Sequence, residues 1–137
     1  MSGSHTVAAI DCGTNSIRLL IASADSDGRL VEQARELEMV RLGQGVDATG
    51  SFRPDALERT FSACRTFAQA IADHHCDRVG FVATSAARDV SNRDAFFAGV
   101  RQALGVDAEV IDGMEEASLS FAGAISGIQV IDEPVLV

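Results

Sequence analysis

The sequence predicts an α/β protein in which helices pack on a mixed β-sheet. Three β-forming runs follow one another before residue 43, which is typical of an antiparallel meander. After residue 53 the spacing of the apolar residues changes to the period of a helix. Strands and helices then alternate, so the predicted element order is βββαβαβα with one further strand at the end.

The meander is predicted from three segments. The first two strands are the apolar runs at 7–10 and 17–22, and the third is 29–42, which follows the turn sequence DSDG. The next segment, GQGVDATGSF at 43–52, contains three glycines and is predicted to be a loop.

A long amphipathic helix is predicted to begin at Pro54, because proline is favoured in the first helical turn and two acidic residues follow closely. Its apolar residues recur at helical spacing and share one face: Leu57, Phe61, Cys64, Phe67 or Ala68, and Ile71. This face is expected to pack against the sheet.

The segment RVGFVAT at 78–84 predicts a buried strand, and a second helix follows it. Ser91 and Asp94 have the spacing of a capping box, and Gly105 is a typical end for the helix. The expected buried side chains of this helix are Phe97, Val100 and Leu104.

The remaining residues predict a short strand at 108–112, a helix opened by Asp112 with Glu115 as its capping partner, and a last strand in EPVLV. A strand at the very end of an α/β chain usually leads into further structure. We therefore expect residues 1–137 to form one domain, the N-terminal lobe of a longer protein whose second lobe is absent from this chain.

Composition limits the possible partners and compartment. The 137 residues carry a net charge of −9, and all 11 basic residues are arginines. Such a surface disfavours nucleic acid and anionic membranes as partners. The three cysteines lack the spacing of a disulfide framework or a zinc site, and no segment has the length and apolarity of a signal peptide or a membrane span. The cytoplasm is the expected location.

One polar run interrupts the core of the predicted meander. Asp11 ends the first strand, and Gly13, Thr14, Asn15 and Ser16 lead into the second. Glycine allows close approach of a ligand, and successive N–H groups of a turn bind anions. An aspartate beside bound phosphate suits Mg²⁺. From these residues alone, an ordinary hairpin with a polar turn is an equally good interpretation.

Four segments, in order, resemble one known family. IDCGTNSIRLLIA at 10–22 resembles the first phosphate motif, D-x-G-[ST]-N-S, of the exopolyphosphatase and guanosine pentaphosphate phosphohydrolase family, which lies within the actin-like ATPase superfamily. The loop RLGQGVD, the segment TSAARDVSNRDAF and the segment VIDGMEEASLSFAGA also match the family. The resemblance implies a ribonuclease H-like lobe.

The resemblance also implies a reaction, which is Mg²⁺-dependent hydrolysis of the terminal phosphoanhydride of inorganic polyphosphate. Glu116 would be the base for the attacking water, and Arg88 would offset phosphate charge. Asp11 would place the metal ion. The remaining implied residues, which would hold phosphoryl oxygens, are Gly13, Thr14, Asn15 and Ser16.

Alternatives remain open at this point. The substrate could be guanosine pentaphosphate, the protein could be a sugar kinase or ATPase of the same superfamily, or the lobe could bind polyphosphate or an alarmone without cleaving it. Without the resemblance, Glu115 and Glu116 fit a helix N-terminus and Arg88 fits a solvated surface. Because this chain is acidic, we expect the basic track for a polyanion to lie in the missing lobe. The oligomeric state is open, with a homodimer of the full-length protein as one option.

Overall fold

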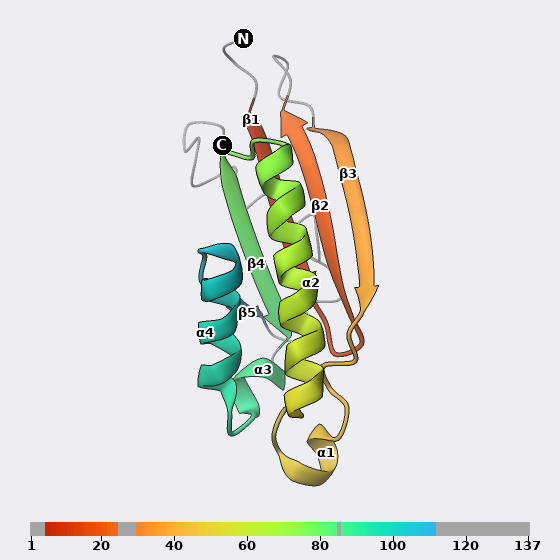
Figure 1. The fold of residues 1–137 in the computed structure, drawn as a ribbon, viewed down its shortest axis with the longest axis vertical. Coiled ribbons are helices and arrows are strands. Elements are labelled where there is room, and N and C mark those ends of the chain that lie inside the picture. Colours follow the sequence, from red (N-terminus) through yellow and green to blue (C-terminus); the bar gives the residue numbers. More distant parts are fainter. Residues whose placement is uncertain (1–4, 25–29, 85, 112–137) are drawn as a thin grey trace.

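The computed structural model describes residues 5–24, 30–84 and 86–111. It contains a five-stranded mixed sheet in the order β3-β2-β1-β4-β5 (Figure 1). The β1–β2 and β2–β3 pairs are antiparallel, and the β1–β4 and β4–β5 pairs are parallel. The strands are β1 (His5–Cys12), β2 (Ser16–Ala24), β3 (Leu30–Met39), β4 (Arg78–Thr84) and β5 (Glu109–Ile111).

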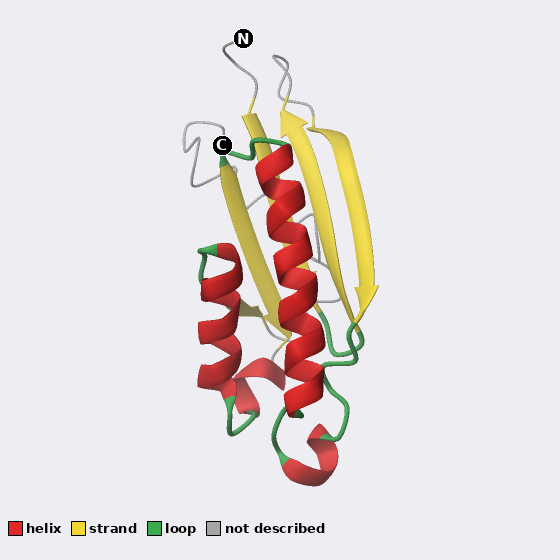
Figure 2. Ribbon diagram, viewed as in Figure 1, coloured by secondary structure: helices red, strands yellow, loops and turns green. Residues whose placement is uncertain are grey.

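The helices of the described part are α1 (Val46–Thr49), α2 (Pro54–Asp73), α3 (Ala86–Asp89) and α4 (Arg93–Leu104). The two long ones, α2 and α4, lie side by side over one face of the sheet (Figure 2). The predicted α/β class and mixed sheet are confirmed. The predicted helix after Asp112 and the last strand lie outside the described residues.

The meander is confirmed, with each strand somewhat longer or shorter than predicted. The segment 43–52 is not entirely loop, because it contains the single-turn helix α1. This turn is flanked by Gly45 and Gly50, whose φ angles are 78° and 73°. Glycine adopts this left-handed conformation without a steric penalty, so both glycines serve to start and stop one turn of helix.

Helix α2 begins at Pro54, as predicted, and buries one face against the sheet. Leu57, Cys64 and Phe67 are buried, and Phe61 and Ile71 are partly buried. Thr60 is also fully buried. Its burial leaves no unsatisfied hydroxyl, because the hydroxyl donates to the Ala56 carbonyl at 2.9 Å.

Helix α4 ends at Gly105 as predicted, with φ 76°. The predicted capping box is wrong, because the N-cap residue is Asn92 and no side chain caps the helix. Instead, the Asn92 amide both accepts from the Phe52 N–H (3.0 Å) and donates to the Phe52 carbonyl (2.9 Å). The Ser91 hydroxyl likewise lies 2.6 Å from that of Ser51. These side chains tie α4 to the loop before α2.

Phenylalanines fill the core between the sheet and the two helices. Phe96 is fully buried, and its ring centroid lies 5.5 Å from that of Phe52, 6.3 Å from that of Phe81 and 5.4 Å from that of Phe97. Such tilted and edge-to-face pairs are favourable beyond the area they bury. The aromatic cluster therefore holds the start of α2, the strand β4 and the helix α4 in one place.

The central strands are buried on both faces. Ala8, Ile10 and Cys12 face the helices, whereas Val7 and Ala9 belong to a second buried cluster with Leu20 and Ala22. This two-sided burial explains why β1 and β2 are nearly continuous apolar runs instead of alternating. The polar turn between them is thus anchored on rigid strands.

Candidate phosphate-binding site

Those predicted site residues that the structure describes lie at one end of the sheet. Strands β1, β4 and β5 are parallel, and in the ladder Cys12 pairs with Ala83 while Thr84 pairs with Ile111. Their carboxyl ends therefore meet at the same edge, beside the β1–β2 turn and the short helix α3 (Figure 1). Ligands of open α/β sheets bind at this kind of edge.

The turn between β1 and β2 is narrow and closed by its own backbone. The Gly13 N–H donates to the Ser16 carbonyl at 2.9 Å. The exposed tip of the turn consists of Thr14 and Asn15.

A second segment, residues 40–44, holds this turn from outside. The Asn15 carbonyl accepts hydrogen bonds from the N–H groups of Val40 (3.0 Å) and Arg41 (2.8 Å). The Thr14 carbonyl accepts one from Gly43 at 2.8 Å. The packing there is close, because a Cβ on Gly43 would lie 3.2 Å from the Thr14 Cβ. We call residues 40–44 the clasp.

The hydrogen bonds from the clasp occupy the backbone acceptors at the tip of the turn. Both tip carbonyls are occupied by the clasp, whereas the N–H groups of Thr14 and Asn15 have no acceptor anywhere in 5–24, 30–84 or 86–111. Adjacent backbone N–H groups of this kind, with a hydroxyl and an amide beside them, can bind an anion. This arrangement favours the phosphate-binding interpretation over that of an ordinary polar hairpin.

Asp11 is half-buried near the end of β1 and pairs in the ladder with Arg18 of β2. The two residues share one face of the sheet, and Arg18 is exposed. Arg18 was not among the site residues predicted from the sequence. The predicted hairpin contained the signal, because a turn at 13–16 places residue 18 opposite residue 11.

A pocket of about 380 Å³ opens beside the tip of the turn. Its wall includes one basic residue, Arg41, and one acidic residue, Asp47. The segment 41–47 resembles the family in sequence, but its position in a pocket beside the turn was not predicted. The lining residues are Thr14, Asn15, Arg41, Gly43, Gln44, Val46 and Asp47.

Of the two predicted catalytic residues, Arg88 and Glu116, only Arg88 lies within the described part of the chain. Arg88 belongs to α3, which begins two residues after the end of β4, so its backbone lies at the same edge of the sheet as the turn. Glu116 lies outside the described residues, as does Glu115.

Asp11 is a candidate metal ligand near the end of β1. Across 5–24, 30–84 and 86–111 no three His, Cys, Asp or Glu side chains cluster closely enough to hold a metal ion. Mg²⁺ is usually bound through one or two carboxylates, with waters and substrate phosphates completing its shell. A single aspartate beside an anion-binding turn fits that donor set.

Comparison with known proteins identifies the family. Residues 20–137 match the model of the Ppx/GppA phosphatase family. The chain belongs to this family. It is 53% identical over 139 residues to exopolyphosphatase 2 of Mycobacterium tuberculosis (strain H37Rv), and the match covers 96% of this chain and 44% of that protein.

Solved structures of Ppx/GppA proteins have the same fold. A crystal structure described as an exopolyphosphatase-like protein is 53% identical, with a TM-score of 0.79 over 96% of this chain and 40% of that one. The Ppx/GppA family member from Aquifex aeolicus is 33% identical, with a TM-score of 0.76 over 80% of this chain and 36% of that one. The predicted actin-like fold and family membership are thus confirmed. The chain spans less than half the length of these relatives and corresponds to their N-terminal part.

The described helices do not include one with both the length and the apolarity to cross a membrane.

Proposed function

We propose that the protein to which this chain belongs is an exopolyphosphatase, which hydrolyses the terminal phosphoanhydride of inorganic polyphosphate and releases orthophosphate. The observation that carries the proposal is the 13–16 turn, whose tip carbonyls are occupied by the clasp while the adjacent N–H groups of Thr14 and Asn15 have no acceptor in the part of the chain that the structure describes. Membership of the Ppx/GppA phosphatase family, with 53% identity to an exopolyphosphatase, supports the reaction class.

In the proposed reaction, water attacks the terminal phosphorus and the bond from that phosphorus to the bridging oxygen breaks. Glu116 accepts the proton of the attacking water, and the shortened polyphosphate leaves as an anion. The charge of the transition state lies mainly on the peripheral phosphoryl oxygens. The N–H groups of Thr14 and Asn15, which the turn fixes in advance, stabilise that charge, and the Arg88 guanidinium would add to them.

A Mg²⁺ ion is part of the proposal. Asp11 would hold it, directly or through water, at the end of β1. When bound, the ion supplies positive charge that neutralises the phosphate oxygens. The chain's own contribution is to orient the terminal phosphate on the turn and to keep a carboxylate beside it.

We assign the protein to the cytoplasm, since the structure describes all three cysteines and none forms a disulfide. Because this chain is acidic, we propose that the missing lobe supplies most of the positive charge that binds a long polyanion.

The test is phosphate release from long-chain polyphosphate, guanosine pentaphosphate and ATP, each with and without Mg²⁺. The 137-residue chain is compared with the full-length protein and with its Glu116→Gln variant. The proposal requires that the full-length protein prefers polyphosphate and that Glu116→Gln lowers kcat about 100-fold or more while polyphosphate still binds. We expect the short chain to be inactive because it lacks the second lobe.

Other outcomes would replace the proposal. Preference for guanosine pentaphosphate would change the substrate but keep the reaction. Binding of polyphosphate with no release by the full-length protein would make it a binding module, and transfer of the terminal phosphoryl group of ATP to an added sugar, without release of free phosphate, would make it a kinase.

A further inference from the structure

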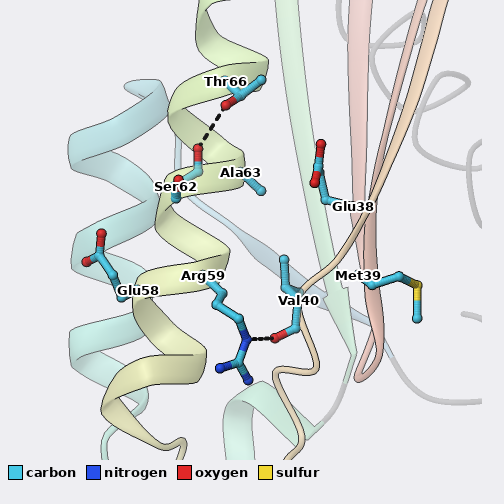
Figure 3. Close-up of a pocket in the computed structure, with 8 residues that line it drawn as sticks. All are labelled: Glu38, Met39, Val40, Glu58, Arg59, Ser62, Ala63 and Thr66. Atoms are coloured by element: carbon cyan, nitrogen blue, oxygen red, sulfur yellow. Dashed lines mark hydrogen bonds between the residues drawn. The ribbon is translucent and has the colours of Figure 1, made fainter.

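Arg59 of helix α2 forms hydrogen bonds with the clasp. Its Nε donates to the Val40 carbonyl at 2.8 Å (Figure 3). Its Nη2 donates to the Gln44 Oε1 at 2.8 Å. Its Nη1 lies 3.5 Å from the Asp55 carboxylate. One guanidinium thus holds both ends of residues 40–44.

Val40 connects this arginine to the turn. Its carbonyl accepts from Arg59, and its N–H donates to the Asn15 carbonyl at 3.0 Å. Val40 is itself buried, so its backbone groups need these partners. A displacement of the clasp therefore changes the position of the turn tip directly.

The clasp has a conformation that needs support. Arg41 has φ 51°, in the left-handed region that costs a residue with a side chain about 1 kcal/mol or more. Such a conformation persists when the surrounding contacts determine it. The hydrogen bonds from Arg59 are two of those contacts.

The surroundings of Arg59 favour a structural use of its guanidinium. It borders a pocket of about 440 Å³ between α2 and the end of β3, together with Glu38 and Glu58. The lining residues include no other basic side chain. The Arg53 guanidinium, hydrogen-bonded to Asp55, lowers the pKa of that carboxyl, so Asp55 remains ionised beside Arg59. The guanidinium nitrogens of Arg59 are directed to the clasp and to Asp55. They are therefore poorly placed to bind an anion in this pocket.

We propose that Arg59 is a positioning residue for the phosphate-binding turn, acting through the clasp and not by contact with substrate. The inference rests on the proposed function of the turn. Arg59 holds Val40 and Gln44, the clasp holds the carbonyls of Thr14 and Asn15, and the tip N–H groups stay aligned for the terminal phosphate.

The experiment uses the full-length protein and three variants. Arg59→Gln removes the charge and the forked donors, and Arg59→Lys keeps the charge but cannot bridge Val40 and Gln44 together. Arg65→Gln is the matched control, because Arg65 is on the same helix and its Nη2 lies 2.8 Å from Glu58. Two properties are measured: kcat/KM for polyphosphate at several salt concentrations, and the hydrogen exchange rates of the Val40, Arg41 and Gly43 amides.

We expect Arg59→Gln and Arg59→Lys each to lower kcat/KM about tenfold or more and to raise the three exchange rates about tenfold or more. Arg65→Gln should stay within about twofold of wild type in both measurements. The salt dependence of KM should be unchanged in Arg59→Gln, because a residue that does not touch the substrate adds no screened contact to it.

Any one of three results would overturn the role of Arg59 in an active enzyme. The first is wild-type kcat/KM in Arg59→Lys, which would make the effect one of charge. The second and third are wild-type exchange rates and wild-type kcat/KM in Arg59→Gln. If wild-type protein releases no phosphate, the proposed function fails, and the exchange rates still decide whether Arg59 holds the clasp.

Discussion

Asp11 and Arg18 lie opposite each other on β1 and β2, next to Cys12 and Ile17, which form the last pair of the ladder before the turn. An acidic and a basic side chain thus share one face of the sheet next to the turn that we propose binds phosphate. In a hydrolase of phosphoanhydrides these two charges have complementary uses, since a carboxylate suits a metal ion and a guanidinium suits phosphoryl oxygens.

We expect Asp11→Asn to raise the Mg²⁺ concentration needed for half-maximal activity about tenfold, because the amide is a weaker ligand for a hard cation than a carboxylate. The measurement is a Mg²⁺ titration of phosphate release by the full-length protein. Asp107→Asn is a suitable control, since Asp107 is an exposed acid paired with Arg101 at 3.0 Å. An unaltered Mg²⁺ requirement would exclude Asp11 as a metal-binding residue.

Arg18→Gln should raise the KM for polyphosphate about three- to tenfold and leave the Mg²⁺ requirement nearly unchanged. The reason is the loss of one cation at the edge of the site, where it attracts the substrate through screened electrostatic interaction. The KM values are compared at low and high salt, and the difference from wild type should shrink as salt increases. A salt-independent difference would argue against this electrostatic role.

Gly99 of α4 packs directly on the ring of Phe61 of α2, because a Cβ at this position would overlap the ring. We expect Gly99→Ala to lower the free energy of unfolding by about 1–3 kcal/mol through overpacking, despite the better helix propensity of alanine. Chemical denaturation measures the change. Combining Gly99→Ala with Phe61→Leu should destabilise by less than the sum of the single variants, and strict additivity would refute the contact.

Burial raises the pKa of the Cys64 thiol to about 12, an effect that the Arg65 charge opposes only in part. In the unfolded chain the pKa of a thiol is about 8.5. Between these values the folded state holds one more proton, so the stabilising contribution is complete below about pH 8.5 and declines as pH rises, by at most about 1.4 kcal/mol per pH unit.

Denaturation at pH 8, 9 and 10 tests this expectation. Cys64→Ala should show a shallower loss of stability with pH than the wild type. Cys76→Ala is the comparison, because burial also raises the pKa of the Cys76 thiol but that side chain is partly exposed. Identical pH slopes for wild type and Cys64→Ala would contradict the assignment.

The order of the elements could be predicted because its signals are local. Pro54 begins α2 and Gly105 ends α4, and in each case the backbone preference of one residue decides the boundary. The capping box at Ser91 could not be judged in the same way. Asn92 and Ser91 are bound by Phe52 and Ser51, which lie 40 residues away in the chain. The spacing of residues within one segment cannot show that groups 40 residues away bind these side chains.

The sequence itself determined the family and the residues of the 13–16 turn, because the turn is one contiguous run whose small size and donor groups follow from residue identity. Tertiary structure alone decided how this turn is supported. Asn15, Val40 and Arg59 come from three separate segments, and their hydrogen bonds exist only after the sheet and α2 have packed together. The same holds for Arg18 beside Asp11, since strand register places them together. Hydrogen bonds require positions within a few tenths of an ångström, and only the assembled core provides that precision.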